Sequence, residues 1–141
     1  MKHPTKTKGL SMIEMLVVIA VFGILLSIGA LLINGLLQRQ RLNEASRVFG
    51  ESLRRVSELA VTESQPITAT VSATQLSWAE DGGANRGSQP LPYNAEMSSS
   101  SSTNFTFNGR GLPTEPETFV VTLGSNSRTI YLLPTGAVTY Q

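Results

Sequence analysis

The chain has 141 residues, 40% of them hydrophobic, and a formal net charge of +1. It contains no cysteine and one histidine, His3, so disulfide bonds, thiolate metal sites, cysteine nucleophiles and histidine-based metal or acid–base sites are excluded. All three lysines precede Gly9, and the eight arginines and ten acidic residues that remain carry a net charge of −2. The charge balance therefore gives no general case for binding nucleic acid or anionic lipid.

An apolar segment follows the basic N-terminal tail. Glu14 is the only charge near its start, and residues 15–37 carry none. At about 1.5 Å per residue, those roughly 23 residues extend about 35 Å, enough to cross a bilayer core of about 30 Å. The basic residues ahead of the segment predict a cytoplasmic N-terminus. The segment is too long for the apolar region of a secretory signal peptide, which spans about 7–15 residues.

The helical pattern continues beyond residue 37. Apolar residues recur at three- and four-residue steps, with Arg and Glu between them: Leu42, Ala45, Val48, Phe49, Leu53, Val56, Leu59 and Ala60. This predicts one helix from Leu10 to about Thr62, ended by Gln65-Pro66. Glycines in its apolar half are typical of membrane helices and also permit local unwinding or close helix contact; the sequence does not separate these explanations.

After Pro66 the apolar period changes from 3.6 to 2, which is typical of strands. Strands are predicted over residues 67–74, 76–78, 104–107, 118–123, 128–133 and 137–140. Residues 81–103 are rich in glycine, proline and serine and are predicted to form a long loop. We therefore predict an α+β fold, with an antiparallel sheet of about five or six strands packed on the apolar face of the helix's second half.

Two acidic groups give no predicted site. Glu115 and Glu117 flank Pro116 and fit a solvated turn, because catalytic carboxylate pairs need burial and a cleft. The Asp81-Gly82-Gly83 segment lacks the alternating ligand spacing of a calcium loop. No catalytic residue, metal site or cofactor is predicted, and enzymatic function has no support.

The N-terminal residues resemble a known processing signal. Gly9 followed by Leu10-Ser11-Met12-Ile13-Glu14-Met15 is similar to the class III signal of type IV pilins and pseudopilins, commonly Gly then Phe-Thr-Leu-Ile-Glu-Leu. Further segments resemble the GspH/FimT group of minor pilins and pseudopilins: residues 42–46, 54–60, 65–67, 78, 107–113 and 135–138. The chain lacks the C-terminal disulfide of many major pilins, and it has Leu31 where those pilins have a helix-kinking proline.

The resemblance implies a division of the chain and a set of partners. Residues 1–9 would be the leader, residues 10–37 a transmembrane and later filament-core helix, and residues 38–141 the globular domain. A prepilin peptidase would cut between Gly9 and Leu10 and methylate the new amine of Leu10. Glu14 would pair with that amine, its own or a neighbouring subunit's; the alternative is a solvated carboxylate near the interface. Other pilins and an inner-membrane assembly platform would be further partners.

The resemblance does not decide which assembly this subunit would serve. A minor pilin of a type IV pilus is the main prediction, and a type II secretion pseudopilin of the GspH type is the alternative. A third is a DNA-binding minor pilin for uptake, with Arg110 and Arg128 as candidate contacts. Gly109-Arg110-Gly111-Leu112 matches only the first half of the family's Gly-Arg-x-Arg patch. One or two arginines neutralise too few phosphates for firm DNA binding. An unrelated single-pass anchor would not explain Gly9 and Glu14 together.

Overall fold

The computed structural model describes residues 11–80, 83 and 85–141, without the side chains of residues 28–32. The predicted processing residues Gly9 and Leu10 therefore lie outside the described residues. The chain divides into two compact units, Met1–Leu37 and Gln38–Gln141, and each is considered by itself.

Helix α1 spans Met12–Glu63, close to the predicted bounds. It ends in a left-handed C-terminal cap: Ser64 has a φ of 53°, its N–H donates to the carbonyl of Val61, and the N–H of Gln65 donates to the carbonyl of Ala60, both at 3.2 Å. Pro66 follows directly and cannot extend the helix. Within the described residues, no helix meets the length and apolarity required of a membrane span.

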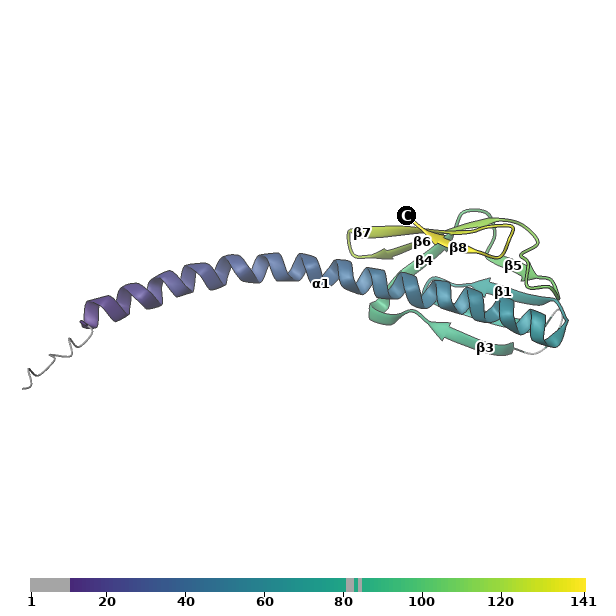
Figure 1. Ribbon diagram of the computed structural model, residues 1–141, viewed down its shortest axis with the longest axis horizontal. Coiled ribbons are helices and arrows are strands. Elements are labelled where there is room, and N and C mark those ends of the chain that lie inside the picture. Colours follow the sequence, from purple (N-terminus) through teal and green to yellow (C-terminus); the bar gives the residue numbers. More distant parts are fainter. Residues whose placement is uncertain (1–10, 81–82, 84) are drawn as a thin grey trace, which may run out of the picture. The chain divides into compact units, whose positions relative to one another are not determined.

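The strands of the second unit form two antiparallel sheets (Figure 1). The first sheet has the order β3-β2-β1-β5 and the second has the order β4-β6-β7-β8. The strands of the first sheet are β1 (Ile67–Val71), β2 (Gln75–Glu80), β3 (Asn85–Pro90) and β5 (Asn104–Phe107). Those of the second are β4 (Glu96–Ser99), β6 (Glu117–Leu123), β7 (Asn126–Leu132) and β8 (Val138–Tyr140). The α+β class is confirmed, but the prediction of one sheet of five or six strands is wrong.

The prediction of a loop over residues 81–103 is also wrong, because this part of the chain contains β3, the short 3-10 helix η1 (Pro92–Asn94) and β4. Strand β3 is polar along its whole length and pairs only with β2, so it has no alternation to detect. Its Gly87 lies opposite Trp78, whose ring covers the space that a side chain would fill. In β4 only Met97 is buried. Backbone hydrogen bonds hold β3 against β2 and β4 against β6, and such pairing is not visible in the pattern of side chains.

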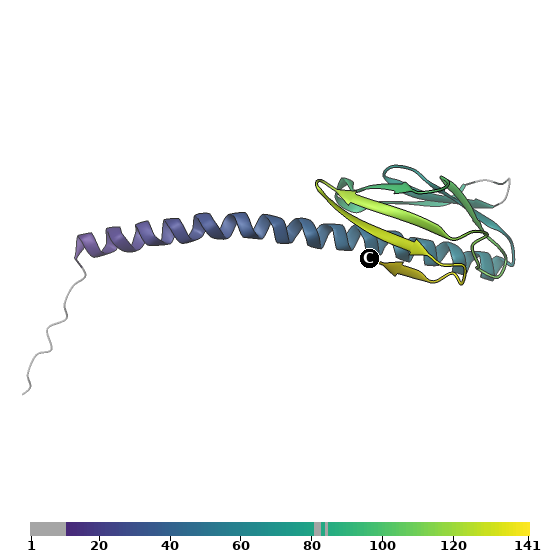
Figure 2. The same cartoon turned by 90° about the horizontal axis from the view of Figure 1, so that it is seen from above.

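The core lies between the second half of α1 and both sheets. Buried α1 residues recur at three- and four-residue steps, which confirms the predicted amphipathic face: Leu42, Ala45, Phe49, Leu53, Val56 and Ala60. Phe119 from β6 meets Phe49 edge-on at 5.0 Å and Phe105 from β5 at 5.3 Å between ring centroids. These three rings join the helix to both sheets. Figure 2 shows β8 running alongside this half of the helix.

Candidate functional site

Glu14 lies in the first turn of α1 and is exposed. Its Oε2 accepts a hydrogen bond from the backbone N–H of Ser11 at 3.2 Å. Ser11 and Glu14 have the Ser-x-x-Glu spacing of a capping box, in which the acid satisfies an N–H that the helix leaves free. A negative charge is also favourable beside the positive end of the helix dipole. The carboxylate thus has a local role in starting α1.

Arg110 lies in the turn between β5 and β6 and is exposed. The Asn108 side chain holds this turn, since its Oδ1 accepts from the N–H groups of Arg110 at 2.9 Å and Leu112 at 3.1 Å. The turn contacts α1 through Ser57, whose hydroxyl donates to the carbonyl of Gly111 at 2.7 Å. The hydrogen bond to Asn108 is made by the backbone of Arg110, and its exposed side chain faces solvent.

Arg128 lies on β7, and its surroundings differ from those of Arg110. Its Nη1 donates to Asn43 Oδ1 at 2.5 Å, and its guanidinium lies over the Tyr140 ring at 5.4 Å from the centroid. Asn43 and Ser57, the α1 positions that contact the two arginine-bearing segments, are 14 residues apart, or about 21 Å along the helix. The structure therefore does not bring Arg110 and Arg128 together.

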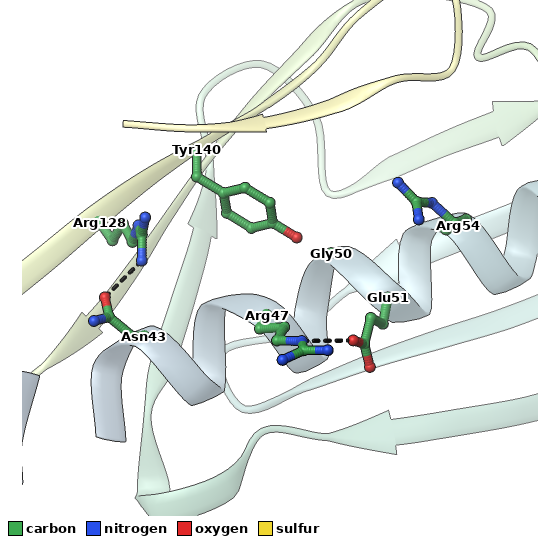
Figure 3. A pocket seen from close by; sticks show the side chains of 7 residues that line it. All are labelled: Asn43, Arg47, Gly50, Glu51, Arg54, Arg128 and Tyr140. Carbon is green, nitrogen blue, oxygen red and sulfur yellow. Dashed lines mark hydrogen bonds and ion pairs between the residues drawn. The ribbon is translucent and has the colours of Figure 1, made fainter. Parts of the chain in front are cut away.

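Arg128 instead joins two arginines of α1 around a surface cavity of about 480 Å³. We call this cavity the arginine groove; it is lined by Asn43, Arg47, Gly50, Glu51, Arg54, Arg128 and Tyr140 (Figure 3). Asn43, Arg47 and Arg54 are spaced by four and seven residues, which places them on one helix face. Tyr140 reaches over Gly50, where a Cβ would overlap its hydroxyl. Gly50 thus lets β8 approach the helix.

The groove has an excess of positive charge. Arg47 Nε pairs with Glu51 Oε1 at 2.8 Å, but these side chains are 78% and 60% exposed, so the pair is weak. Among the ion pairs of the described residues, none involves Arg54 or Arg128. Three guanidiniums and one carboxylate leave a formal charge of +2. Arg47 and Arg54 were not predicted as site residues, because charged positions between the apolar residues of an amphipathic helix are usually solvated; their seven-residue spacing was the available signal.

Glu115 and Glu117, the two acidic residues predicted to lie in a solvated turn, differ in how far they are buried. Glu115 is exposed, as expected, whereas Glu117 is only 4% exposed and belongs to β6. Its Oε2 accepts a hydrogen bond from the Ser99 hydroxyl on β4 at 3.1 Å. The prediction of a solvated position is wrong for Glu117, because it lies on the same buried face of β6 as Phe119 and Val121. No group of three or more His, Cys, Asp or Glu suited to a metal occurs in the described part of the chain.

A second polar contact ties η1 to the helix. The Tyr93 hydroxyl donates to Glu44 Oε2 at 2.6 Å, and Arg41 lies over the Tyr93 ring at 5.5 Å. The hydrogen bond to Glu44 raises the pKa of Tyr93; desolvation and the negative charge of Glu44 also raise it, whereas Arg41 lowers it. Tyr93 and Asn94 both have positive φ, at 62° and 55°, so this contact restrains a strained segment.

Comparison with known proteins found a sequence motif at the N-terminus and solved structures with a similar fold. Residues 4–30 match the prokaryotic N-terminal methylation motif. The type IV minor pilin FimU of Pseudomonas aeruginosa matches with a TM-score of 0.64 at 16% identity, over 73% of this chain and 90% of FimU. The chain has the fold of type IV pilins and carries the N-terminal methylation motif.

Further structures agree on this pilin-like fold. A second crystal form of FimU gives a TM-score of 0.59 at 16% identity, over 71% of this chain and 92% of FimU. The minor pseudopilin EpsH of the Vibrio cholerae type 2 secretion system gives 0.53 at 12% identity, over 72% of this chain and 96% of EpsH. No curated protein sequence matches the chain. At these identities the pilin-like chain shares a fold with both kinds of subunit.

Proposed function

We propose that the chain is a minor pilin, processed at its N-terminus and incorporated into a type IV pilus, where it initiates or supports assembly. The observation that carries this proposal is the N-terminal methylation motif over residues 4–30 in a chain with the pilin fold. Prepilin peptidase would cut between Gly9 and Leu10 and methylate the amine of Leu10. Removing the leader discards the three lysines that would hold the segment at the cytoplasmic face.

Residues 10–37 would first anchor the chain in the bacterial inner membrane, with the N-terminus in the cytoplasm and residues 38–141 outside it. The support is the charge-free run over residues 15–37 and the basic residues that precede it. The same apolar surface would then pack in the filament core, after extraction by the assembly platform and contact with other pilins. Exposed apolar side chains along Met12–Leu26 are consistent with partners on this segment.

Glu14 would direct that packing. An ionised carboxylate in an apolar environment costs several kcal/mol unless it is paired. The hydrogen bond from Ser11 occupies Oε2, and no hydrogen bond to Oε1 occurs among the described residues. Cleavage after Gly9 would create a positive amine on Leu10, directly before Ser11 in sequence. That amine, from the same or a neighbouring subunit, would complete the pairing of Glu14.

The test is expression of the full chain with a prepilin peptidase and a pilus assembly system. Mass spectrometry should find an N-terminal peptide that begins at a methylated Leu10. Glu14→Ala should be cleaved normally but lost from sheared pili, whereas Glu58→Ala, which removes an exposed acid from the second half of α1, should be incorporated. Normal incorporation of Glu14→Ala would contradict the assigned role, and an uncleaved N-terminus would contradict the proposal itself.

A type II secretion pseudopilin is the second candidate, favoured by the likeness to EpsH. The same processing and the same role of Glu14 apply to it. The two are separated by deleting the gene in its host and measuring secreted proteins beside surface pili. Loss of secretion with normal piliation would assign the chain to secretion. DNA uptake through Arg110 and Arg128 is a third candidate, less supported because the two arginines lie far apart.

A further inference from the structure

Glu117 is a buried carboxylate with a partner on only one of its two oxygens. Its Oε2 accepts the hydrogen bond from the Ser99 hydroxyl, and no hydrogen bond to its Oε1 occurs among the described residues. In that part of the chain, the fully enclosed side-chain atoms without a partner are Ser46 Oγ and Glu63 Oε2, so Glu117 Oε1 is reached from outside. A carboxylate held away from water is costly unless a positive group pairs with it.

The space that Glu117 faces is a surface cavity of about 240 Å³ between β5 and the start of β6. We call it the Glu117 cavity. Glu115 also lines it, and the remaining lining side chains, which include Phe105 and Thr114, are uncharged. The two carboxylates, with no lysine, arginine or histidine among the lining residues, give a formal charge of −2. The cavity therefore favours a cation.

The acceptors of the cavity suit an ammonium group better than a guanidinium or a metal ion. A guanidinium pairs best with a carboxylate whose two oxygens are both free, but Ser99 holds Oε2 of Glu117. Calcium takes about six to eight oxygen ligands, and the described residues provide no group of three acids. An ammonium has three donors. The two carboxylates accept two of them, and Thr114 Oγ1, which donates its own proton to the carbonyl of Thr106 at 2.9 Å, keeps lone pairs for the third.

The apolar side of the cavity suits an alkyl stem. Phe105 is the apolar residue of the lining, and it is buried. Its ring centroid lies 5.6 Å from that of Phe107 and 5.3 Å from that of Phe119, so neighbouring rings hold it in place. Long basic side chains bury their methylene groups against such surfaces and keep the charged end among polar groups. Lysine combines a four-carbon stem with a compact ammonium.

We propose that the Glu117 cavity binds the ε-ammonium group of a lysine that belongs to a different protein subunit. Glu117 Oε1, the Glu115 carboxylate and Thr114 Oγ1 accept its hydrogen bonds, and Phe105 packs against its stem. All three lysines of this chain precede Gly9, so a processed copy has none to supply. The identity of the partner rests on the proposed function, since an uncleaved copy keeps its lysines; the binding of lysine by the cavity does not.

The test titrates the full chain, in a perdeuterated non-ionic detergent, with blocked tripeptides whose central residue is lysine, arginine or norleucine. Saturation-transfer NMR on the side-chain methylene groups measures contact and affinity. We expect the lysine peptide to bind at least about fivefold more tightly than the arginine peptide, and norleucine to show no binding.

Three substitutions locate the binding. Glu117→Gln, whose side-chain oxygen can still accept from Ser99, should weaken binding of the lysine peptide about tenfold, because it neutralises a buried partner. Glu115→Gln should weaken it about threefold, because an exposed carboxylate contributes less. Glu96→Gln is the matched control: it removes an exposed acid of β4 that does not line the cavity, and binding should be unchanged. The leader lysines are present in every variant, so differences between variants report the cavity.

A preference for lysine that is lost in Glu117→Gln and kept in Glu96→Gln supports the proposal. Equal binding of the lysine and arginine peptides, equal losses in Glu117→Gln and Glu96→Gln, or tighter binding of Ca²⁺ or the free diamine cadaverine in competition with the lysine peptide would each overturn it. If Glu117→Gln does not fold, an unchanged affinity in Glu115→Gln overturns it. These results are obtained without a pilus, so they leave the proposed function standing, whereas an uncleaved N-terminus would overturn that function and leave the lysine preference intact.

Discussion

Replacing Gly50 with alanine sets two effects of known sign against each other. Alanine in a helix interior is favoured over glycine by about 1 kcal/mol. The new Cβ, however, would overlap the Tyr140 hydroxyl, and the ring would have to move. Tyr140 belongs to the three-residue edge strand β8, so it can move, but the move would break the contact with Arg128, worth about 0.5–1 kcal/mol at an exposed site.

The two effects nearly cancel, so we expect Gly50→Ala alone to change the free energy of unfolding by less than about 0.5 kcal/mol. In a Tyr140→Ala background the overlap is absent, and the same substitution should stabilise the protein by about 1 kcal/mol. The coupling between the two positions should therefore be about 1 kcal/mol.

Urea unfolding of the full chain in detergent measures this coupling, with the fluorescence of the single, buried Trp78 as the probe. The four proteins of the double-mutant cycle are compared under identical conditions. If Gly50→Ala stabilises both backgrounds equally, within about 0.3 kcal/mol, then Tyr140 does not pack on Gly50 and the geometry of the arginine groove is wrong.

Three further predictions concern backbone strain, a buried hydroxyl and a raised pKa. Gly124→Ala should cost about 1 kcal/mol in unfolding experiments, because Gly124 has a φ of 62° and a Cβ there would meet nothing within 4 Å; an unchanged stability would refute strain at this turn. Ser46→Ala should be neutral or stabilising by up to about 1 kcal/mol, because the buried Ser46 Oγ has no hydrogen-bond partner among the described residues, whereas Ser52→Ala removes a 2.7 Å hydrogen bond; a clear loss of stability in Ser46→Ala would contradict this. Ultraviolet titration of Tyr93 should show a pKa that falls on Glu44→Gln; the stability from the raised pKa is present below about pH 10 and is lost as the pH rises through the pKa of Tyr93, and an unchanged titration would exclude the contact.

Patterns that arise within one element were predictable. The face of α1 that includes Phe49 and Leu53 was visible at three- and four-residue steps, because a helix buries one side at its own period. Strands β6 and β7 alternate because one face of each meets the core. Edge strand β3 showed no pattern, since neither face is buried and its pairing with β2 is made by backbone groups.

Charged residues were harder to place. Glu117 follows a proline and looked solvated, yet it lies on the buried face of β6 and accepts a hydrogen bond from Ser99. Arg110 and Arg128 were grouped as candidate DNA contacts because they are the only basic residues after Arg86. Strand β7 instead brings Arg128 beside Asn43, near the arginines of α1.

The sequence by itself determined the N-terminal motif, the long helix, the α+β class and Glu14 as the acid in the first helical turn. Each of these depends on residues close together along the chain. Only the tertiary structure divided the strands into two sheets and placed Arg47, Arg54 and Arg128 around one groove under Tyr140. The groove joins residues more than 70 positions apart, and it depends on how β7 and β8 pack on the helix, which local periodicity does not specify.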